Sequence, residues 1–348
     1  MSDRYRVAVI GTRFGQHGHV PAFQADSRCE VVGICATNVD RTREIATKLD
    51  LAKAYGDWRE VVDDVDVDVV SIATPPDVQP GIALAAIEKG KAVFCEKPLS
   101  VSIADAEKLV EAAMRNGVAN TVNFEFPQGD MWRHARQMID QGSIGQIRTA
   151  EVSWHVLIYA NRMGLKNWKT DAARGGGALF NFVSHVFHYL ELIGGKIDRI
   201  SAHLHSTRAD APQGDTLVQA MVEFASGATA SIAVNTDTGP TNIHRVAIYG
   251  DSGTILLENQ SKDYIDGFRL WHGRRDQDSM RIVDPPARSD SDNTTDGRSV
   301  ATSRLVRQFV DAIETGHAAS PTFEVALRVQ RLLDAARRSH ETRNWVNV

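Results

Sequence analysis

Residues 177–193 carry hydrogen-bonding side chains at helical spacing. At about 100° per residue, one face of this predicted helix holds a polar stripe. The stripe consists of Asn181, Ser184, His185 and His188. A solvent-exposed face would carry lysine and glutamate, whereas this stripe is uncharged, so it is typical of a helix that lines a polar cavity. His185 is then the natural proton donor or acceptor, because imidazole titrates near neutral pH.

Lys97 follows directly after the predicted strand 91–96, and Pro98 ends that strand. The carboxyl ends of parallel strands form the edge at which open sheets bind ligands. An ammonium group there could hydrogen-bond a substrate oxygen and stabilise alkoxide character on it. The alternative is a solvated lysine that happens to precede a proline.

Other polar side chains are candidates for substrate contacts. Asn123 and Glu125 lie where the predicted strand 118–124 ends. Trp168 and Lys169 lie before a Gly-Gly-Gly run, in a connection that is too long to be only a link. We therefore predict substrate contacts from all four, in addition to Lys97 and the polar stripe.

Paired histidines raise metal binding as an alternative. His185 and His188 are three residues apart, and His203 and His205 lie on a later predicted strand. No carboxylate or thiolate has matching spacing, so no metal is expected. His188 keeps three open interpretations: a catalytic helper, a substrate contact or a packed core histidine.

The stretch VAVIGTRFGQHGHVPAF, residues 7–23, nearly matches the dinucleotide-binding turn G-x-G-x-x-G. Gly11 fits the first glycine, but Arg13 stands at the second position and Gln16 at the third. The turn ends a predicted strand and opens a predicted helix, which is the context that the motif requires. The turn's predicted cofactor contacts are Gly11, Thr12, Arg13, Phe14 and Gly15.

The end of the predicted strand 29–36 favours NADP over NAD. No acid stands at 36–38 to hold a ribose 2′-hydroxyl, whereas Arg41 and Arg43 follow and would attract a 2′-phosphate. The alternative is that both arginines form a solvated helix face, and NAD stays possible. The remaining predicted cofactor contacts are Thr37, Asn38, Arg41, Ala73, Thr74, Pro75, Pro76, Glu96 and Lys97.

The first third of the chain alternates short apolar strands with helical patterns. Strands are predicted at 5–11, 29–36, 67–73, 91–96 and 118–124, and helices at 15–26, 39–50, 57–63, 77–89 and 102–116. Strands that are nearly all apolar are buried on both faces, which requires helices above and below them. The pattern therefore predicts an N-terminal Rossmann domain, an α/β fold with a doubly wound parallel sheet, over residues 1–123.

After about residue 124, strands follow one another without helices between them, which indicates a mostly antiparallel sheet in an α+β domain over 124–348. Two amphipathic helices are predicted near the C-terminus, at 299–315 and 322–340. The polar, turn-rich stretch 285–298 predicts a mobile loop or lid.

Composition narrows the class of partner. The chain has 348 residues and a formal net charge of -5, which gives no electrostatic reason to expect nucleic acid or an anionic membrane. No stretch reaches the roughly 20 apolar residues of a membrane span. The three cysteines are widely spaced in apolar runs, so a disulfide framework is not expected. We predict a cytoplasmic protein with a small-molecule partner.

With ATPPD at 73–77, CEKPLS at 95–100 and GGGALFNFVSH at 175–185 added to the glycine turn, the chain resembles the Gfo/Idh/MocA oxidoreductases. The motifs come in the family's order and cover most of the chain. The resemblance implies a nicotinamide-dependent dehydrogenase or reductase acting on sugar-like or cyclitol-like substrates. It also implies that the open C-terminal sheet supplies substrate contacts and often joins subunits, here as a homo-oligomer, a dimer or a tetramer.

The resemblance also implies residue roles. Lys97 would be the electrophilic helper, His185 the acid/base and Asn181 its orienter. The family often carries Asp where Asn181 stands. An amide can orient an imidazole but cannot stabilise an imidazolium, so His185 should be a weaker base here. Two alternatives stay open: a nucleotide-sensing regulator without turnover, and a reductase of an imine or a ring double bond.

Overall fold

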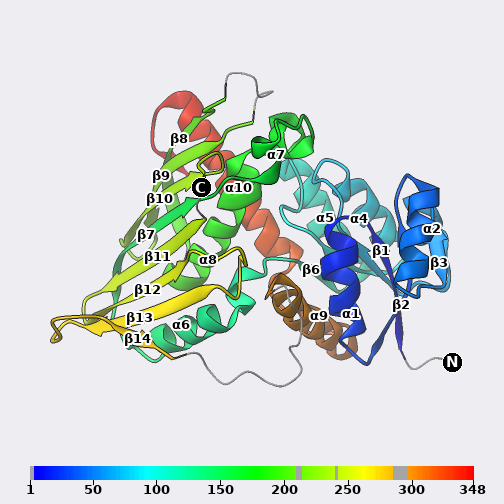
Figure 1. Cartoon of the computed structure of the whole chain (residues 1–348), viewed down its shortest axis with the longest axis horizontal. Helices are drawn as coiled ribbons and strands as arrows, with labels where there is room; N and C mark the ends of the chain where they lie inside the picture. Colours follow the sequence, from blue (N-terminus) through cyan, green and yellow to red (C-terminus); the bar gives the residue numbers. More distant parts are fainter. Residues whose placement is uncertain (1–3, 209–213, 240–241, 285–296) are drawn as a thin grey trace. The chain divides into compact units, whose positions relative to one another are not determined.

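The computed structural model describes residues 4–208, 214–239, 242–284 and 297–348. They form two compact units (Figure 1). Unit 1 comprises Met1–Glu125 and Arg298–Gln330, and unit 2 comprises Phe126–Gly297 and Arg331–Val348.

In the described part of unit 1, six parallel strands form one sheet in the order β3-β2-β1-β4-β5-β6. The strands are β1 (Tyr5–Ile10), β2 (Cys29–Cys35), β3 (Lys53–Tyr55), β4 (Val69–Ile72), β5 (Ala92–Cys95) and β6 (Asn120–Val122). The connecting helices are η1 (Gly15–His19), α1 (Val20–Gln24), α2 (Val39–Lys48), α3 (Trp58–Asp63), α4 (Gln79–Glu88) and α5 (Ile103–Asn116). The predicted Rossmann sheet is confirmed.

The core of unit 1 explains why the strands are apolar on both faces. Residues of α1 and α2 share one buried cluster with β1, β2 and β5, while α3, α4 and α5 pack against one another. Phe23 of α1 and Phe94 of β5 meet edge to face, with ring centroids 5.5 Å apart. Burying such a side chain contributes about 1.5–3 kcal/mol.

The C-terminal helix α9 (Gly297–Thr315) also packs into this core, through Leu305, Val306, Phe309 and Val310. The ring of Phe309 lies 5.7 Å from that of Phe94. The structure thus places most of α9 with unit 1, whereas the hydrophobic pattern alone offers no reason to separate it from residues 124–348. The next helix, α10 (Phe323–Thr342), contributes residues to both units.

In the described part of unit 2, nine strands form a sheet in the order β14-β13-β12-β11-β7-β10-β9-β8-β15. Its strands are β7 (Ile147–His155), β8 (Ile197–His205), β9 (Leu217–Phe224), β10 (Thr229–Asn235), β11 (Ile243–Gly250), β12 (Gly253–Asn259), β13 (Phe268–Arg274), β14 (Arg281–Val283) and β15 (Val346–Asn347). Only β7 and β10 pair in parallel among these strands. The predicted mostly antiparallel sheet is confirmed.

The helical segments of unit 2 are short. They are η2 (Phe126–Gln128), α6 (Asp130–Asp140), α7 (Tyr159–Arg162), η3 (Trp168–Thr170), η4 (Ala172–Arg174), η5 (Leu179–Val183) and α8 (Ser184–Gly194). The predicted helix 177–193 therefore begins with a π-helical turn, η5, and continues as α8. A π turn shifts the faces of a helix relative to the regular 100° spacing, and such turns are frequent at functional sites.

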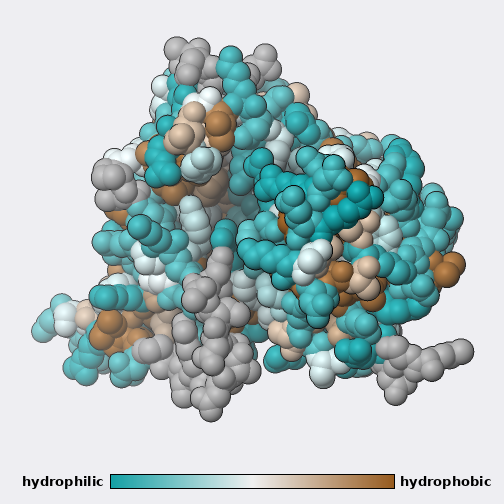
Figure 2. Space-filling view, turned by 45° about the vertical axis from the view of Figure 1, so that its right-hand side comes forward, coloured by the Kyte–Doolittle hydropathy of each residue, from teal (hydrophilic) through white to brown (hydrophobic). Residues whose placement is uncertain are grey.

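Surface and topology bear on several expectations. On the face shown in Figure 2, the described residues are mostly hydrophilic, with hydrophobic ones in small groups. Among the residues described, no helix is long and apolar enough to cross a membrane. The cysteines Cys29, Cys35 and Cys95 are buried free thiols. The predicted loop at 285–298 lies outside the described residues except for its last two, which begin α9.

Candidate active site

The carboxyl ends of the parallel strands bring the predicted residues of unit 1 to one edge of its sheet. Gly11 follows β1, Thr74 follows β4, Lys97 follows β5 and Asn123 follows β6, while Asn38 lies beyond β2. This is the edge at which doubly wound sheets bind dinucleotides. These residues share one edge because all strands of a parallel sheet end on the same side.

Gly11 brings the ends of β1 and β4 into close approach. Its φ is +119°, and a Cβ at this position would lie 2.3 Å from the carbonyl oxygen of Ala73. No other residue type fits without moving backbone. The first glycine of a dinucleotide turn makes this kind of tight turn, so the cradle fits a bound pyrophosphate.

Gly15 packs the first helical turn onto the sheet. A Cβ on Gly15 would lie 3.0 Å from Cγ1 of Val9 and 3.4 Å from Cβ of Ala73. Close helix-to-strand packing is the task of the third glycine in the motif, which the motif's spacing assigns to Gln16. In this chain that packing position is taken by Gly15, the first residue of η1.

The polar side chains predicted to bind the adenosine end of the cofactor follow β1 and β2, and some of them are paired whereas others face solvent. Oδ1 of Asn38 accepts from the backbone N–H of Arg41 at 3.1 Å and so caps α2. Arg43 forms an exposed ion pair with Asp40, with 3.1 Å between Nη1 and Oδ1. Arg13 and Arg41 are exposed. These two cations are therefore the better candidates for a 2′-phosphate.

A buried hydrogen-bond network supports the segment that carries Lys97. Oε1 of Glu96 accepts from Nε2 of His19 at 3.0 Å and from Nδ2 of Asn123 at 2.7 Å. Nδ1 of His19 lies 2.8 Å from Oγ of Ser71, and the His19 side chain is fully buried. Burial acts to raise the pKa of Glu96, but the bond from His19 and the charge of Lys97 outweigh it and lower that pKa.

Gln79 fixes the backbone on both sides of Lys97. Its Nε2 donates to the carbonyl oxygens of Glu96 at 2.7 Å, Pro98 at 3.1 Å and Leu99 at 3.1 Å. Gln79 is completely buried, so the amide has no competing solvent. The half-buried Lys97 side chain thus starts from a well-anchored backbone. Neither His19 nor Gln79 was among the predicted site residues.

Glu125 is the second carboxyl group at this edge. It is 7% exposed, and its Oε2 atom has no hydrogen-bond partner among the described residues. Burial, followed by the charge of Glu96, raises the pKa of Glu125 to about 7, against the opposing charges of Lys97 and Arg298. Both the protonated and the ionised form of Glu125 are therefore populated near neutral pH.

Arg298 is a site residue that sequence reasoning missed. It lies at the start of α9, and its guanidinium carbon is 5.3 Å from the centroid of the Phe14 ring in the glycine turn. The next residue, Ser299, donates from Oγ to the carbonyl oxygen of His17 at 3.1 Å, and these two residues are 282 positions apart. Only the folded structure reveals contacts over such a separation.

His185 lies within the aromatic core of unit 2. It is 5% exposed, and its ring meets that of Phe126 edge to face at 4.8 Å between centroids. Asn181 donates from Nδ2 to the carbonyl oxygen of Gly177 at 3.0 Å, one turn earlier. The predicted role of Asn181 as orienter of His185 stays a prediction.

His188 is also buried, at 4% exposure, and burial lowers the pKa of its imidazole to about 3. The ring is therefore neutral throughout the physiological range. Of the three interpretations of this histidine, the packed core residue fits its burial best, and the predicted substrate contact stays a prediction.

Asp215 holds the start of the His185 helix in place. Its Oδ2 accepts from the backbone N–H of Leu179 at 2.8 Å, and its carbonyl oxygen accepts from Ala178 N–H at 2.8 Å. A Cβ on Gly177 would lie 2.4 Å from Oδ1 of Asp215. This close approach explains the last glycine of the Gly-Gly-Gly run. Asp215 was not among the predicted site residues.

Asp215 gives a prediction for stability against pH. Burial raises the pKa of Asp215 from 3.8 to about 6, so the folded chain binds its proton more tightly than the unfolded chain. The resulting stabilisation is present below pH 4 and is lost as the pH rises through 6. At about 1.4 kcal/mol per pH unit, the loss is roughly 3 kcal/mol.

In the Asp215→Asn variant, which stays neutral, this loss is absent. Urea unfolding at pH 4.5 and 7.5 should therefore show a smaller decrease in unfolding free energy than for the wild type. Asp198→Asn, which removes an exposed carboxylate of the same unit, is the matched control. An identical pH dependence in Asp215→Asn and wild type would refute the raised pKa.

The predicted substrate residues Trp168 and Lys169 lie close to the same turn. A Cβ on Gly176 would be 2.3 Å from the carbonyl oxygen of Trp168. The Lys169 ammonium is exposed and lies 5.7 Å from the centroid of the Trp168 ring. Unit 2 thus brings this pair next to the helix that carries Asn181 and His185, and their contact with substrate stays a prediction.

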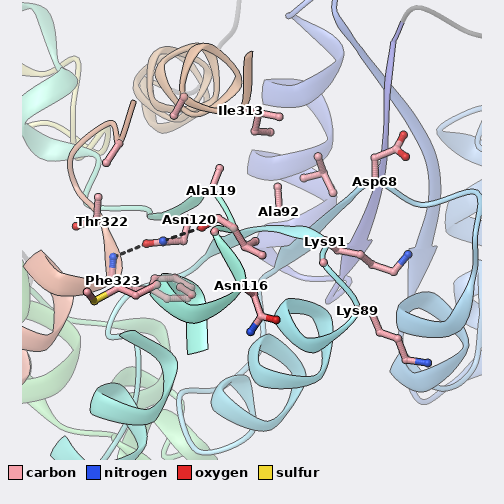
Figure 3. Close-up of a pocket in the computed structure, with 18 of the residues that line it drawn as sticks. Asp68, Lys89, Lys91, Ala92, Asn116, Ala119, Asn120, Ile313, Thr322 and Phe323 are labelled. Atoms are coloured by element: carbon pink, nitrogen blue, oxygen red, sulfur yellow. Dashed lines mark hydrogen bonds between the residues drawn. The ribbon is translucent and has the colours of Figure 1, made fainter. Parts of the chain in front are cut away.

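A different cavity, of about 880 Å³, opens at the opposite edge of the sheet of unit 1 (Figure 3). The Lys91 ammonium donates to the carbonyl oxygens of Asp64 at 2.8 Å and Val67 at 2.6 Å. Asn120 accepts from the Phe323 N–H at 2.7 Å. These polar groups join strand and helix ends, and no predicted site residue lines the cavity.

In the part of the chain that the structure describes, no group of three or more His, Cys, Asp or Glu side chains could hold a metal ion. His203, one of the four histidines of the metal alternative, instead lies with Nδ1 2.8 Å from Nη1 of Arg343. A cation beside a ring nitrogen disfavours metal binding there.

Two family models match the chain. One is described as an oxidoreductase family with an NAD-binding Rossmann fold and matches residues 5–124. The other is described as the C-terminal alpha/beta domain of an oxidoreductase family and matches residues 136–348.

Individual proteins are similar over nearly the whole chain. An uncharacterized oxidoreductase from Synechocystis sp. is 30% identical over 361 aligned residues, covering 100% of this chain and 97% of that protein. Levoglucosan dehydrogenase from Pseudarthrobacter phenanthrenivorans is 26% identical, covering 90% and 88%. A solved structure of a levoglucosan dehydrogenase in complex with NADH has a TM-score of 0.88 at 24% identity and covers 99% of each chain, which shows a shared fold.

Proposed function

We propose that this chain, which belongs to the Gfo/Idh/MocA oxidoreductase family, transfers a hydride between a nicotinamide cofactor and a carbinol or carbonyl carbon of a sugar-like or cyclitol-like small molecule. The observation that carries the proposal is the placement of Lys97. It lies at the ligand-binding edge of a dinucleotide-binding sheet, on a backbone held by Gln79 and the Glu96 network.

The cofactor fits the residues of unit 1. Gly11 makes the tight turn that a pyrophosphate site requires, and the buried Oγ1 of Thr74 has no hydrogen-bond partner among the described residues. The bound nicotinamide would supply the hydride acceptor or donor. Lys97 would hydrogen-bond the substrate oxygen and stabilise its alkoxide character, and His185 would exchange the hydroxyl proton, with Asn181 orienting it.

A substrate screen tests the proposal. A panel of polyols and keto-sugars, with NADP(H) and NAD(H) in parallel and reduced nicotinamide followed by absorbance, should show turnover for at least one substrate class. Tight cofactor binding without turnover of any substrate in the panel would favour a nucleotide-sensing regulator. That alternative stays open because Asn181 carries an amide in place of a carboxylate. Activity on unsaturated substrates alone would favour the reductase of an imine or ring double bond.

We propose NADP(H) as the preferred cofactor and NAD(H) as the weaker one, because Arg13 and Arg41 are exposed cations at the adenosine side of the edge. Replacing Arg13 with glycine should raise the Kd for NADPH by about 10-fold, since a phosphate contact contributes roughly 1.4 kcal/mol. The Kd for NADH should change much less. Titration by nicotinamide fluorescence measures both, and equal changes for the two cofactors would exclude this role of Arg13.

We also propose a homo-oligomer, a dimer or a tetramer, formed through the open face of the unit 2 sheet, and a cytoplasmic location, where the buried thiols stay reduced. Residues along β9 and β10 alternate between buried and exposed, so one face of these strands is open. Met221 on that face is 52% exposed. Light scattering of wild type and Met221→Lys measures the subunit number.

A further inference from the structure

The two carboxyl groups at the ends of β5 and β6 have opposite environments. Glu96 receives hydrogen bonds from His19 and Asn123, whereas Oε2 of Glu125 is buried without a partner among the described residues. A buried carboxylate without donors is costly, and a neighbouring carboxylate raises the cost further. Of the two carboxyl groups, Glu125 is therefore the one that favours its protonated form.

The charges that face Glu125 come from two elements. Glu96 and Lys97 lie at the end of β5, and Arg298 lies at the start of α9. His19 is the titratable neighbour of Glu96. The negative charge of Glu96 favours the protonated form of Glu125, and the two cations favour its ionised form. These opposing effects leave Glu125 with a pKa of about 7, so a change in the nearby charge changes its protonation at neutral pH.

A bound dinucleotide would change this balance according to its redox state. The pyrophosphate belongs at the Gly11 turn after β1, and the adenosine ribose belongs at the end of β2. The nicotinamide half therefore extends towards the ends of β4, β5 and β6, where Lys97 and Glu125 lie. The oxidised nicotinamide ring carries a positive charge, and the reduced ring does not.

We propose that Glu125 is a proton-exchanging residue coupled to the redox state of the cofactor. It releases its proton when the oxidised cofactor binds and keeps it when the reduced cofactor binds. The step breaks the carboxyl O–H bond and delivers the proton to solvent, with no change in the oxidation state of any group. This inference rests on the proposed function, since it requires a nicotinamide cofactor at this edge.

The consequence is a smaller change of charge beside Lys97 when the cofactor changes its redox state. Glu125 is more ionised beside the positive ring and more protonated beside the neutral ring. Glu125 acts through the charge at the site and is a positioning residue in this proposal.

Isothermal titration calorimetry tests the coupling. Oxidised and reduced cofactor are titrated into the protein at pH 7 in two buffers of different ionisation enthalpy, PIPES and imidazole, which gives the number of protons released. If the positive ring lowers the pKa of Glu125 by about one unit, the oxidised cofactor should release roughly 0.4 proton more than the reduced one. The difference should be small at pH 5 and at pH 9.

Glu125→Gln should abolish this difference, whereas Glu111→Gln, which alters an exposed carboxylate on α5, should preserve it. Infrared spectra of the wild type give a second readout that does not depend on a variant. A protonated carboxyl band at pH 7 should fall to roughly a fifth of its intensity on adding oxidised cofactor and persist with reduced cofactor.

The outcomes separate this inference from the proposed function. Equal proton release for both cofactors in the wild type, or an unchanged difference in Glu125→Gln, would overturn the role of Glu125 even if the enzyme turns over. Failure to bind either cofactor would overturn both proposals. Redox-dependent release that vanishes in Glu125→Gln supports the inference whichever substrate is used.

Discussion

Replacing Lys97 with methionine should lower kcat/KM for the best substrate by about 10²–10³-fold, the usual cost of removing one donor to a developing oxyanion. Methionine keeps the apolar length of the side chain but removes the ammonium group. The dissociation constant for the cofactor should stay within about two-fold, because the ammonium group is expected to bind the reacting oxygen of the substrate. Stopped-flow turnover and fluorescence titration measure the two quantities separately.

Lys89→Met provides a matched control. Lys89 is an exposed lysine of the same unit, paired with Asp63 at 2.7 Å between Nζ and Oδ1, and it lies at the opposite edge of the sheet. This variant should keep full activity. If Lys97→Met turned over normally, or showed a decrease in cofactor affinity as large as its decrease in activity, Lys97 would not be the electrophilic helper.

Much of the sheet in unit 1 could be predicted because its strands are apolar along their whole length. Such strands have only one arrangement that buries both faces, and β1, β2, β4 and β5 lie where the pattern placed them. The three-residue strand β3 was missed, since Lys53–Tyr55 has no apolar run and depends on pairing with β2. In unit 2, β13 and β14 carry polar and charged residues that interrupt a simple alternation of apolar and polar side chains.

The candidate site residues at the strand ends could be predicted from the sequence, whereas the buried residues that support them could not. Lys97 could be found because a proline follows a strand end, which is a local signal. The backbone around Lys97 is supported by His19 and Gln79, which hydrogen-bond Glu96 from 77 and 17 residues away in the sequence. No local sequence signal distinguishes these two from other buried polar residues. Asp215 beneath Gly177 and Arg298 beside Phe14 are also long-range contacts. Tertiary packing, rather than periodicity, selects such residues.

The π turns show how a correct motif can still give a wrong register. Both the glycine turn and the His185 helix begin with a π turn, η1 and η5, in which hydrogen bonds span one more residue than in an α-helix. A single regular helical wheel therefore does not describe residues 177–193, because Asn181 lies in the π turn η5 and His185 lies in the α-helix α8.

Replacing His185 with asparagine should reduce kcat by about 10²–10⁴-fold, the range that general acid–base catalysis supplies. The pH dependence of kcat/KM should also change, because the variant lacks the group expected to exchange the proton. Because His185 is buried against Phe126, thermal unfolding must first show that the variant remains folded.

The matched control is His205→Asn, an exposed histidine on β8 of the same unit. It should leave both the rate and its pH profile unchanged. Lys97 and His185 are expected to serve one substrate oxygen, the first by holding its charge and the second by moving its proton. Their double variant should therefore lose far less activity than the product of the two single losses, because residues that act as a unit are not additive. Fully multiplicative losses would mean that the two side chains act on separate steps, and a His185→Asn enzyme with normal kcat would leave the proton to another group.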